Sequence, residues 1–190
     1  LPYGSKSRNT IIRYSRQIVR FLRTRQVKAI VVACNTASAY ALDTLQQESD
    51  IPIIGVVKPG ARMAAEESPG GNIGVIGTAG TVGSHIYRDY ICSLRPDAQV
   101  FEKACPLFVP LVEEGWRKDP VTETVARRYL EEMIERKVDT LILGCTHYPL
   151  LRSTVRGIMG EKVILVNPAY ETAIELKELL KRENIENQGH

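Results

Sequence analysis

The chain has 190 residues, of which 44% are hydrophobic and 25% are charged, and its 25 Lys and Arg against 22 Asp and Glu give a net charge of +3. These proportions exclude a disordered, collagen-like or low-complexity chain, and the length suffices for a sizeable core. No apolar run approaches the roughly 20 residues of a membrane span, and the sequence does not start as a signal peptide. Four cysteines without a disulfide framework favour a reduced, cytoplasmic protein.

The basic residues gather at the start of the chain. Residues 6–28 hold eight Lys or Arg and no acidic residue, whereas the remainder is net acidic. On a helix such a run is usually a solvated outer face, and we favour that interpretation. The alternative is a non-enzymatic binding protein that contacts nucleic acid through residues 6–28.

Short β-branched runs alternate with amphipathic stretches along the whole chain. The pattern predicts five strands, at 27–33, 51–57, 72–77, 138–144 and 163–166. It predicts helices from 35 to about 47, around 85–94 and over 121–137. Near-continuous apolar strands separated by helices indicate an α/β fold, with a parallel sheet covered on both faces.

An internal repeat points to two related halves. At an offset of 111 residues, Val27–Cys34 (VKAIVVAC) lies over Val138–Cys145 (VDTLILGC). The next predicted strand follows at the same spacing in both copies, without a gap. Each half is therefore predicted to carry a cysteine at the carboxyl end of a strand.

Polar residues follow both cysteines, in the segments Cys34-Asn35-Thr36 and Cys145-Thr146-His147. Ligands of α/β sheets bind beyond the carboxyl ends of strands, and a helix N-terminus there favours anions and lowers the pKa of a thiol. Two opposed thiols suit the inversion of a stereocentre, because one takes a proton from one face while the other supplies a proton to the opposite face. A single thiol with His147 would instead favour acyl transfer.

Three blander alternatives remain for these residues. Both cysteines could be small core residues. A zinc site of Cys34, Cys145 and His147 lacks a clear fourth ligand. The glycines that follow the strand at 72–77 have neither the GxGxxG nor the P-loop spacing, which disfavours nucleotide binding.

Three segments resemble hallmark motifs of bacterial glutamate racemases: Leu1–Gly4 (LPYG), Ala33–Ala37 (ACNTA) and Gly144–Leu151 (GCTHYPLL). Residues 74–78 and 104–113 fit the same family, so the similarity covers essentially the whole chain. The wider superfamily also contains aspartate and hydantoin racemases. A racemase for aspartate or another small amino acid is therefore the nearest alternative.

The repeat and the resemblance together imply two similar doubly wound parallel-sheet lobes with pseudo-two-fold symmetry. Residues 1–70 plus 165–190 would form the lobe that carries Cys34, and 71–164 the lobe that carries Cys145, with the active site between them. The resemblance implies an isomerase without metal, pyridoxal phosphate or nucleotide, which interconverts L- and D-glutamate for peptidoglycan, cell-wall biogenesis and cell shape. It also implies glutamate as the small-molecule partner, a homodimer and no membrane association.

The family motifs also imply roles for single residues. Cys34 would take the α-proton of D-glutamate and Cys145 that of L-glutamate. Glu113 and His147 match auxiliary acid–base residues that flank the two thiols. Substrate contacts are implied for Tyr3, Gly4, Asn35, Thr36, Thr146 and His147, and more weakly for Thr78 and Thr81.

The sequence begins inside the first motif. By resemblance, the family has a strand and an Asp-Ser-Gly loop upstream and a longer segment downstream. We therefore expect the chain to be truncated at both ends relative to the family, and the 190 residues alone to have little activity, with one sheet edge bare.

Overall fold

The computed structural model describes residues 2–187 and 189. Within these residues, none of the helices combines the length and the apolar character that crossing a membrane requires. The elements follow in the order α1 (Arg8–Arg23), β1 (Ile30–Val32), α2 (Asn35–Gln47), β2 (Ile53–Gly55), α3 (Val57–Glu67), β3 (Asn72–Gly77), α4 (Ala79–Gly83), α5 (Ile86–Leu94), β4 (Gln99–Ala104), α6 (Phe108–Glu113), α7 (Pro120–Glu135), β5 (Thr140–Gly144), the 3₁₀ helix η1 (Tyr148–Leu151), α8 (Arg152–Met159), β6 (Ile164–Val166) and α9 (Pro168–Arg182).

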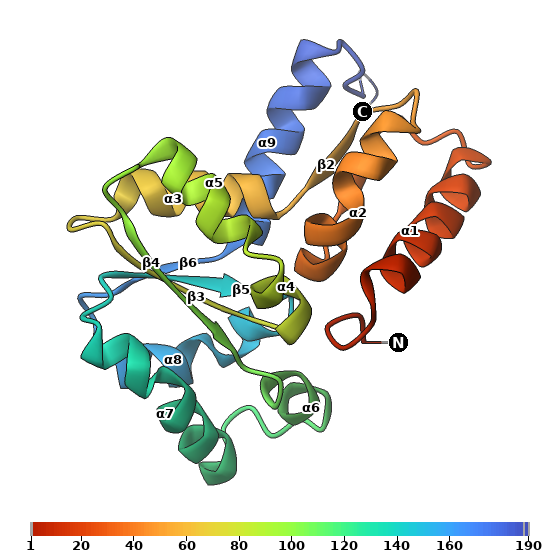
Figure 1. The fold of residues 1–190 in the computed structure, drawn as a ribbon. Coiled ribbons are helices and arrows are strands. Elements are labelled where there is room, and N and C mark those ends of the chain that lie inside the picture. Colours follow the sequence, from red (N-terminus) through yellow and green to blue (C-terminus); the bar gives the residue numbers. More distant parts are fainter. Residues whose placement is uncertain (1, 188, 190) are drawn as a thin grey trace.

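The larger sheet has four parallel strands in the order β4-β3-β5-β6. Helices α3 and α5 cover one face, and α7 and α8 cover the other (Figure 1). This is the doubly wound arrangement that the apolar strands predict, because a parallel sheet must bury both faces.

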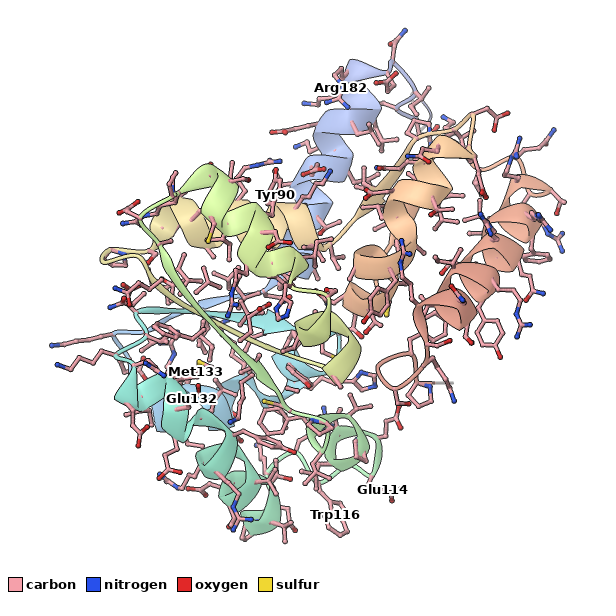
Figure 2. All side chains as sticks on the ribbon, viewed as in Figure 1. Tyr90, Glu114, Trp116, Glu132, Met133 and Arg182 are labelled. Atoms are coloured by element: carbon pink, nitrogen blue, oxygen red, sulfur yellow. The ribbon has the colours of Figure 1, made fainter. Side chains whose placement is uncertain are left out.

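Side chains of the central strands alternate between two apolar clusters, as the pleat of a strand requires. Ile73 and Val75 pack with α3 and α5, whereas Ile76 belongs to the cluster under α7 and α8. Met133 of α7 is fully buried in that second cluster, between the helix and the sheet (Figure 2). Complete burial of such side chains contributes roughly 1.5–3 kcal/mol each to the free energy of unfolding.

The smaller sheet consists of β1 and β2, paired in parallel, with α1 and α2 packed against it. Helix α1 buries a stripe through Ile11 and Val19. Its basic residues lie on the outer side, where Arg16 forms an ion pair with Glu48. The structure therefore agrees with a solvated outer face for the basic segment.

The repeat predicted from the sequence is present in the structure and is longer than predicted. The order α1-β1-α2-β2-α3 recurs as α7-β5-α8-β6-α9, with η1 inserted before α8. Helices α3 and α9 start 111 residues apart, at Val57 and Pro168, and they pack against each other. Gly60 of α3 lies so close to α9 that a Cβ atom there would stand 2.8 Å from Cβ of Pro168.

The predicted strands and helices are all present, with shorter ends for most of the strands. Strand β4 was not predicted, because an edge strand that carries Gln, Glu and Lys lacks a continuous apolar run. The sequence predicts lobe boundaries at 70 and 165. Because α3 packs on the larger sheet and β6 pairs with β5, we propose that the boundaries lie near residues 56 and 167 instead.

Candidate active site

A cavity of about 60 Å³ lies between the smaller and the larger sheet, and both Cys34 and Cys145 line it. The other lining residues come from the first loop, from the start of α2 and from segments that follow β3, β4 and β5: Pro2, Tyr3, Gly4, Asn35, Thr36, Thr78, Val109, Gly144, Thr146 and His147. The residues with implied substrate contacts are among them, except Thr81, for which the motifs imply a weaker contact. Glu113 does not line the cavity.

Cys34 lies where the smaller sheet meets α2. It is the N-cap residue of this 13-residue helix, and its side chain makes no capping hydrogen bond. The first N–H groups of the helix, at Asn35 and Thr36, therefore carry the positive end of the helix dipole into the cavity wall. Tyr3 lines the same cavity wall, and burial together with the neighbouring Cys34 raises the pKa of this tyrosine.

Cys145 directly follows β5 and is buried. Burial raises the pKa of its thiol to about 11, and the nearby Cys34 adds to this rise. Hydrogen bonds from the backbone N–H groups of His147 and Tyr148 and from the Thr146 side chain oppose it. The expectation of a lowered pKa is wrong for Cys145, because a 3₁₀ helix rather than an α-helix follows it and burial outweighs the donors.

Glu113 reaches the cavity through His147. Nε2 of His147 lies 3.2 Å from Oε1 of Glu113, and Nδ1 of the same ring lies 3.7 Å from Sγ of Cys145. The two predicted auxiliary residues therefore form one chain that ends at Cys145. They do not divide between the two thiols, because α6, which carries Glu113, and the loop after β5 lie on the same side of the cavity.

Three threonine hydroxyls join the two halves beside the cavity. Oγ1 of Thr36, on α2, lies 2.9 Å from Oγ1 of Thr78 and 3.2 Å from Oγ1 of Thr81, at α4. All three residues are buried. The carbonyl of Gly4 accepts a hydrogen bond from the N–H of Gly80 at 3.0 Å, so the first loop also docks on α4.

One contact was not predicted from the sequence. Tyr87 of α5 is fully buried, and its hydroxyl donates a 2.6 Å hydrogen bond to Oδ1 of Asn35. In the sequence, Tyr87 and Ile91 share one apolar helix face, a pattern that marks a core position but not the direction of a hydroxyl.

Comparison with known proteins places this arrangement in a family. The Asp/Glu/Hydantoin racemase family model matches residues 1–173. Over 181 residues the chain is 51% identical to a glutamate racemase of Geobacter metallireducens, covering 95% of this chain and 67% of that protein. It is 47% identical to a glutamate racemase of a Sulfurihydrogenibium species, covering 100% of this chain and 72% of that protein. The chain belongs to the glutamate racemase family.

Solved structures of the glutamate racemase family share the fold. Isoform RacE1 from Bacillus anthracis superposes with a TM-score of 0.95 at 40% identity, covering 99% of this chain and 71% of that one. The enzyme of Francisella tularensis, solved with D-glutamate, superposes with a TM-score of 0.93 at 36% identity, covering 100% of this chain and 71% of that one. The predicted family, α/β fold and enzyme class, an amino-acid racemase, are thereby confirmed.

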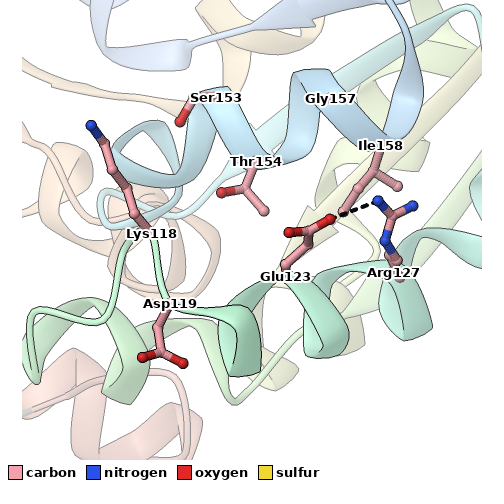
Figure 3. Close-up of a pocket in the computed structure, with 8 residues that line it drawn as sticks. All are labelled: Lys118, Asp119, Glu123, Arg127, Ser153, Thr154, Gly157 and Ile158. Atoms are coloured by element: carbon pink, nitrogen blue, oxygen red, sulfur yellow. Dashed lines mark hydrogen bonds and ion pairs between the residues drawn. The ribbon is translucent and has the colours of Figure 1, made fainter.

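A groove larger than the cysteine-lined cavity lies between α7 and α8 (Figure 3). Its volume is about 370 Å³, and its side chains include an ion pair between Glu123 and Arg127 at 2.6 Å. None of the predicted site residues lines it. It is an open groove, and its charged residues are exposed except for the half-buried Asp119, so it offers no nucleophile shielded from water.

The zinc alternative finds no support in the geometry. Among residues 2–187 and 189, no three His, Cys, Asp or Glu side chains are arranged to hold a metal ion. Cys34, Cys145 and His147 therefore share a cavity wall without forming a ligand set.

Proposed function

We propose that the protein interconverts L- and D-glutamate by moving the α-proton between Cys34 and Cys145. The observation that carries this proposal is that both cysteines line one cavity whose other residues are mostly small or polar. Membership of the glutamate racemase family supports glutamate as the substrate. In a bacterial cell we place the reaction in the cytoplasm, where D-glutamate is a precursor of peptidoglycan.

The reaction balances without any other reactant. The Cys34 thiolate takes the proton from Cα of D-glutamate, and the electron pair of the broken C–H bond stays on Cα, conjugated with the carboxylate. The Cys145 thiol then gives its proton to the opposite face of Cα, which yields L-glutamate and leaves Cys145 as the thiolate. The reverse reaction exchanges the two roles. The raised pKa of Cys145 favours its neutral form, which is the proton donor in the D-to-L direction.

The residues around the thiols supply the electrostatic part of the reaction. Positioned donors lower the barrier because charge develops on the substrate carboxylate as the α-proton leaves. The first N–H groups of α2 and the amide of Asn35 lie at the Cys34 wall, and Thr146 lies at the Cys145 wall. The chain from Glu113 through His147 is placed to exchange protons with Cys145.

Substrate entry requires the cavity to open. A volume of about 60 Å³ is far below the roughly 300 Å³ at which ligand pockets begin. The two walls come from different halves of the chain, joined by the threonine hydroxyls and by the first loop. We therefore propose that the halves move apart to admit glutamate and close again to exclude water.

The test is α-proton exchange in deuterated water. The protein, purified at its full natural length, should racemise both enantiomers and incorporate deuterium at Cα. Cys34→Ser and Cys145→Ser should each lower racemisation by roughly 10²- to 10⁴-fold, the usual contribution of an acid or base. Cys145→Ser should still exchange the α-proton of D-glutamate without inversion, and Cys34→Ser that of L-glutamate, because each variant keeps one base.

The control is Cys92→Ser, which removes a half-buried thiol of α5 that does not line the cavity. This variant should racemise glutamate at the wild-type rate. Normal racemisation by either active-site variant would refute the two-thiol mechanism. Faster turnover of aspartate than of glutamate would refute the choice of substrate, since one methylene group is worth about 10- to 200-fold in specificity.

A further inference from the structure

Tyr87 connects the two halves directly behind the cavity. It belongs to α5, in the half that carries Cys145, and its hydroxyl donates to Oδ1 of Asn35 in the half that carries Cys34. Its ring packs near Gly144, where a Cβ atom would lie 3.5 Å from Cε2 of Tyr87. Tyr87 does not line the cavity, so any effect on the substrate must pass through Asn35.

The hydrogen bond determines which end of the Asn35 amide is available. With Oδ1 occupied by Tyr87, the Nδ2 group is left, and it finds no hydrogen-bond partner in the part of the chain that the structure describes. Among the non-exposed residues that the structure describes, Oε1 of Glu102 is the only side-chain nitrogen or oxygen atom that is both solvent-excluded and without a partner. Nδ2 of Asn35 therefore keeps contact with solvent. Since Asn35 is 4% exposed and lines the cavity, that contact is with the cavity.

The hydroxyl of Tyr87 is suited to donate this hydrogen bond permanently. Burial holds the pKa of Tyr87 well above its ordinary value, so the hydroxyl keeps its proton at neutral pH. A neutral buried hydroxyl needs a partner, because leaving it without a hydrogen bond destabilises the folded state. The bond to Asn35 satisfies it, which favours a single orientation of the amide.

We propose that Tyr87 is a positioning residue that holds the Asn35 amide with its N–H₂ group facing the cavity. An amide in this orientation donates hydrogen bonds, so it binds a carboxylate oxygen of the substrate and rejects the ammonium group. Without the hydrogen bond from Tyr87, the Asn35 side chain would present either Oδ1 or Nδ2 to the cavity. The role in substrate binding rests on the proposed racemase function, whereas the orientation of the amide does not depend on it.

The first arm of the test observes the amide itself. In ¹⁵N NMR spectra, the side-chain amide signals of Asn35 are identified as those lost in Asn35→Ala. The wild type should give two separate amide-proton signals that exchange slowly with water. Tyr87→Phe removes only the hydroxyl and should shift these signals and speed their exchange. Thr172→Val, which removes another buried hydroxyl, bonded to the carbonyl of Pro168, should leave them unchanged.

The second arm measures kinetics in a double-mutant cycle. Tyr87→Phe should lower kcat/KM for both enantiomers by about tenfold, mainly through a higher KM, as expected for one hydrogen bond of about 1.4 kcal/mol. In an Asn35→Ala background the same change should have less than about a twofold effect, because a residue that acts through Asn35 has nothing left to position. Thr172→Val should retain the wild-type kcat and KM.

The outcomes separate the two hypotheses. Unchanged Asn35 amide signals in Tyr87→Phe would overturn the positioning role. Equal kinetic losses with and without Asn35 would overturn it as well, because that result indicates general destabilisation. If the wild type at its full natural length does not racemise glutamate, the proposed function fails, and the amide spectra still decide whether Tyr87 orients Asn35.

Discussion

At the scale of the residue, two opposing effects act on the thiol of Cys145. Burial favours the uncharged form, while the N–H groups of His147 and Tyr148 and the hydroxyl of Thr146 favour the thiolate. Burial is the larger effect and raises the pKa to about 11. A thiol that is neutral at rest but surrounded by donors is ready to give up its proton when a carbanion forms beside it.

The pH dependence of alkylation tests this balance. The rate at which iodoacetamide modifies Cys145, followed by peptide mass spectrometry, should rise about tenfold per pH unit up to pH 11, because only the thiolate reacts. Free cysteine, with its pKa of about 8.5, should level off much earlier. A plateau for Cys145 below pH 9 would contradict the raised pKa.

The same shift has a consequence for stability. Because the pKa is higher in the folded than in the unfolded chain, the folded state holds the proton where the unfolded state has lost it. The stabilisation by the neutral thiol is therefore complete below about pH 8.5 and is lost as the pH rises to about 11.

At the scale of the element, the site depends on the contact between the first loop and α4. A Cβ atom at Gly4 would lie 2.6 Å from Cβ of Thr78, whose hydroxyl is held by Thr36 and Thr81. The loop therefore approaches α4 more closely than any residue with a side chain allows. This close approach places Tyr3 and Gly4 in the cavity wall.

Gly4→Ala should disturb this docking. We expect a loss of about 1–3 kcal/mol in the free energy of unfolding from overpacking, together with a higher KM for glutamate. Urea denaturation and steady-state kinetics measure the two effects. Gly83→Ala is the matched control, because a Cβ atom there meets nothing within 4 Å. Equal free energies of unfolding and equal KM values for the two variants would contradict the close packing at Gly4.

At the scale of the whole molecule, the two copies of the repeat meet where α3 crosses α9 (Figure 1). These helices occupy equivalent places in the two copies, each following the second strand of its copy. Gly60 permits the crossing, since a Cβ atom there would stand 2.8 Å from both Cβ and Cγ of Pro168. The ring of Pro168 begins α9 and has little freedom to move away.

Gly60→Ala should therefore destabilise the protein, by about 1–3 kcal/mol in the free energy of unfolding. Gly157 lies inside α8, and a Cβ atom there meets nothing within 4 Å. Gly157→Ala should therefore stabilise the protein by up to about 1 kcal/mol, because alanine favours the helix more than glycine does. Opposite signs in urea denaturation would confirm that packing between α3 and α9 decides the result. A stabilised Gly60→Ala variant would refute it.

Much of the fold and part of the site follow from local patterns in the sequence. The apolar strands, the repeat and the position of each cysteine at the end of a strand follow from residue type and spacing, because burial on both faces of a parallel sheet demands continuous apolar runs. The motifs around Cys34 and Cys145 indicated the family. Strand β4 escaped prediction because it lies at an edge, where polar residues are tolerated.

Tertiary structure alone decided how these residues act on one another. No spacing in the sequence reveals that Tyr87 donates to Asn35, that Glu113 reaches Cys145 through His147, or that burial outweighs the donors around Cys145. The reason is physical: periodicity records which residues are buried, whereas hydrogen bonds and pKa values depend on which groups from distant segments meet after the chain has packed.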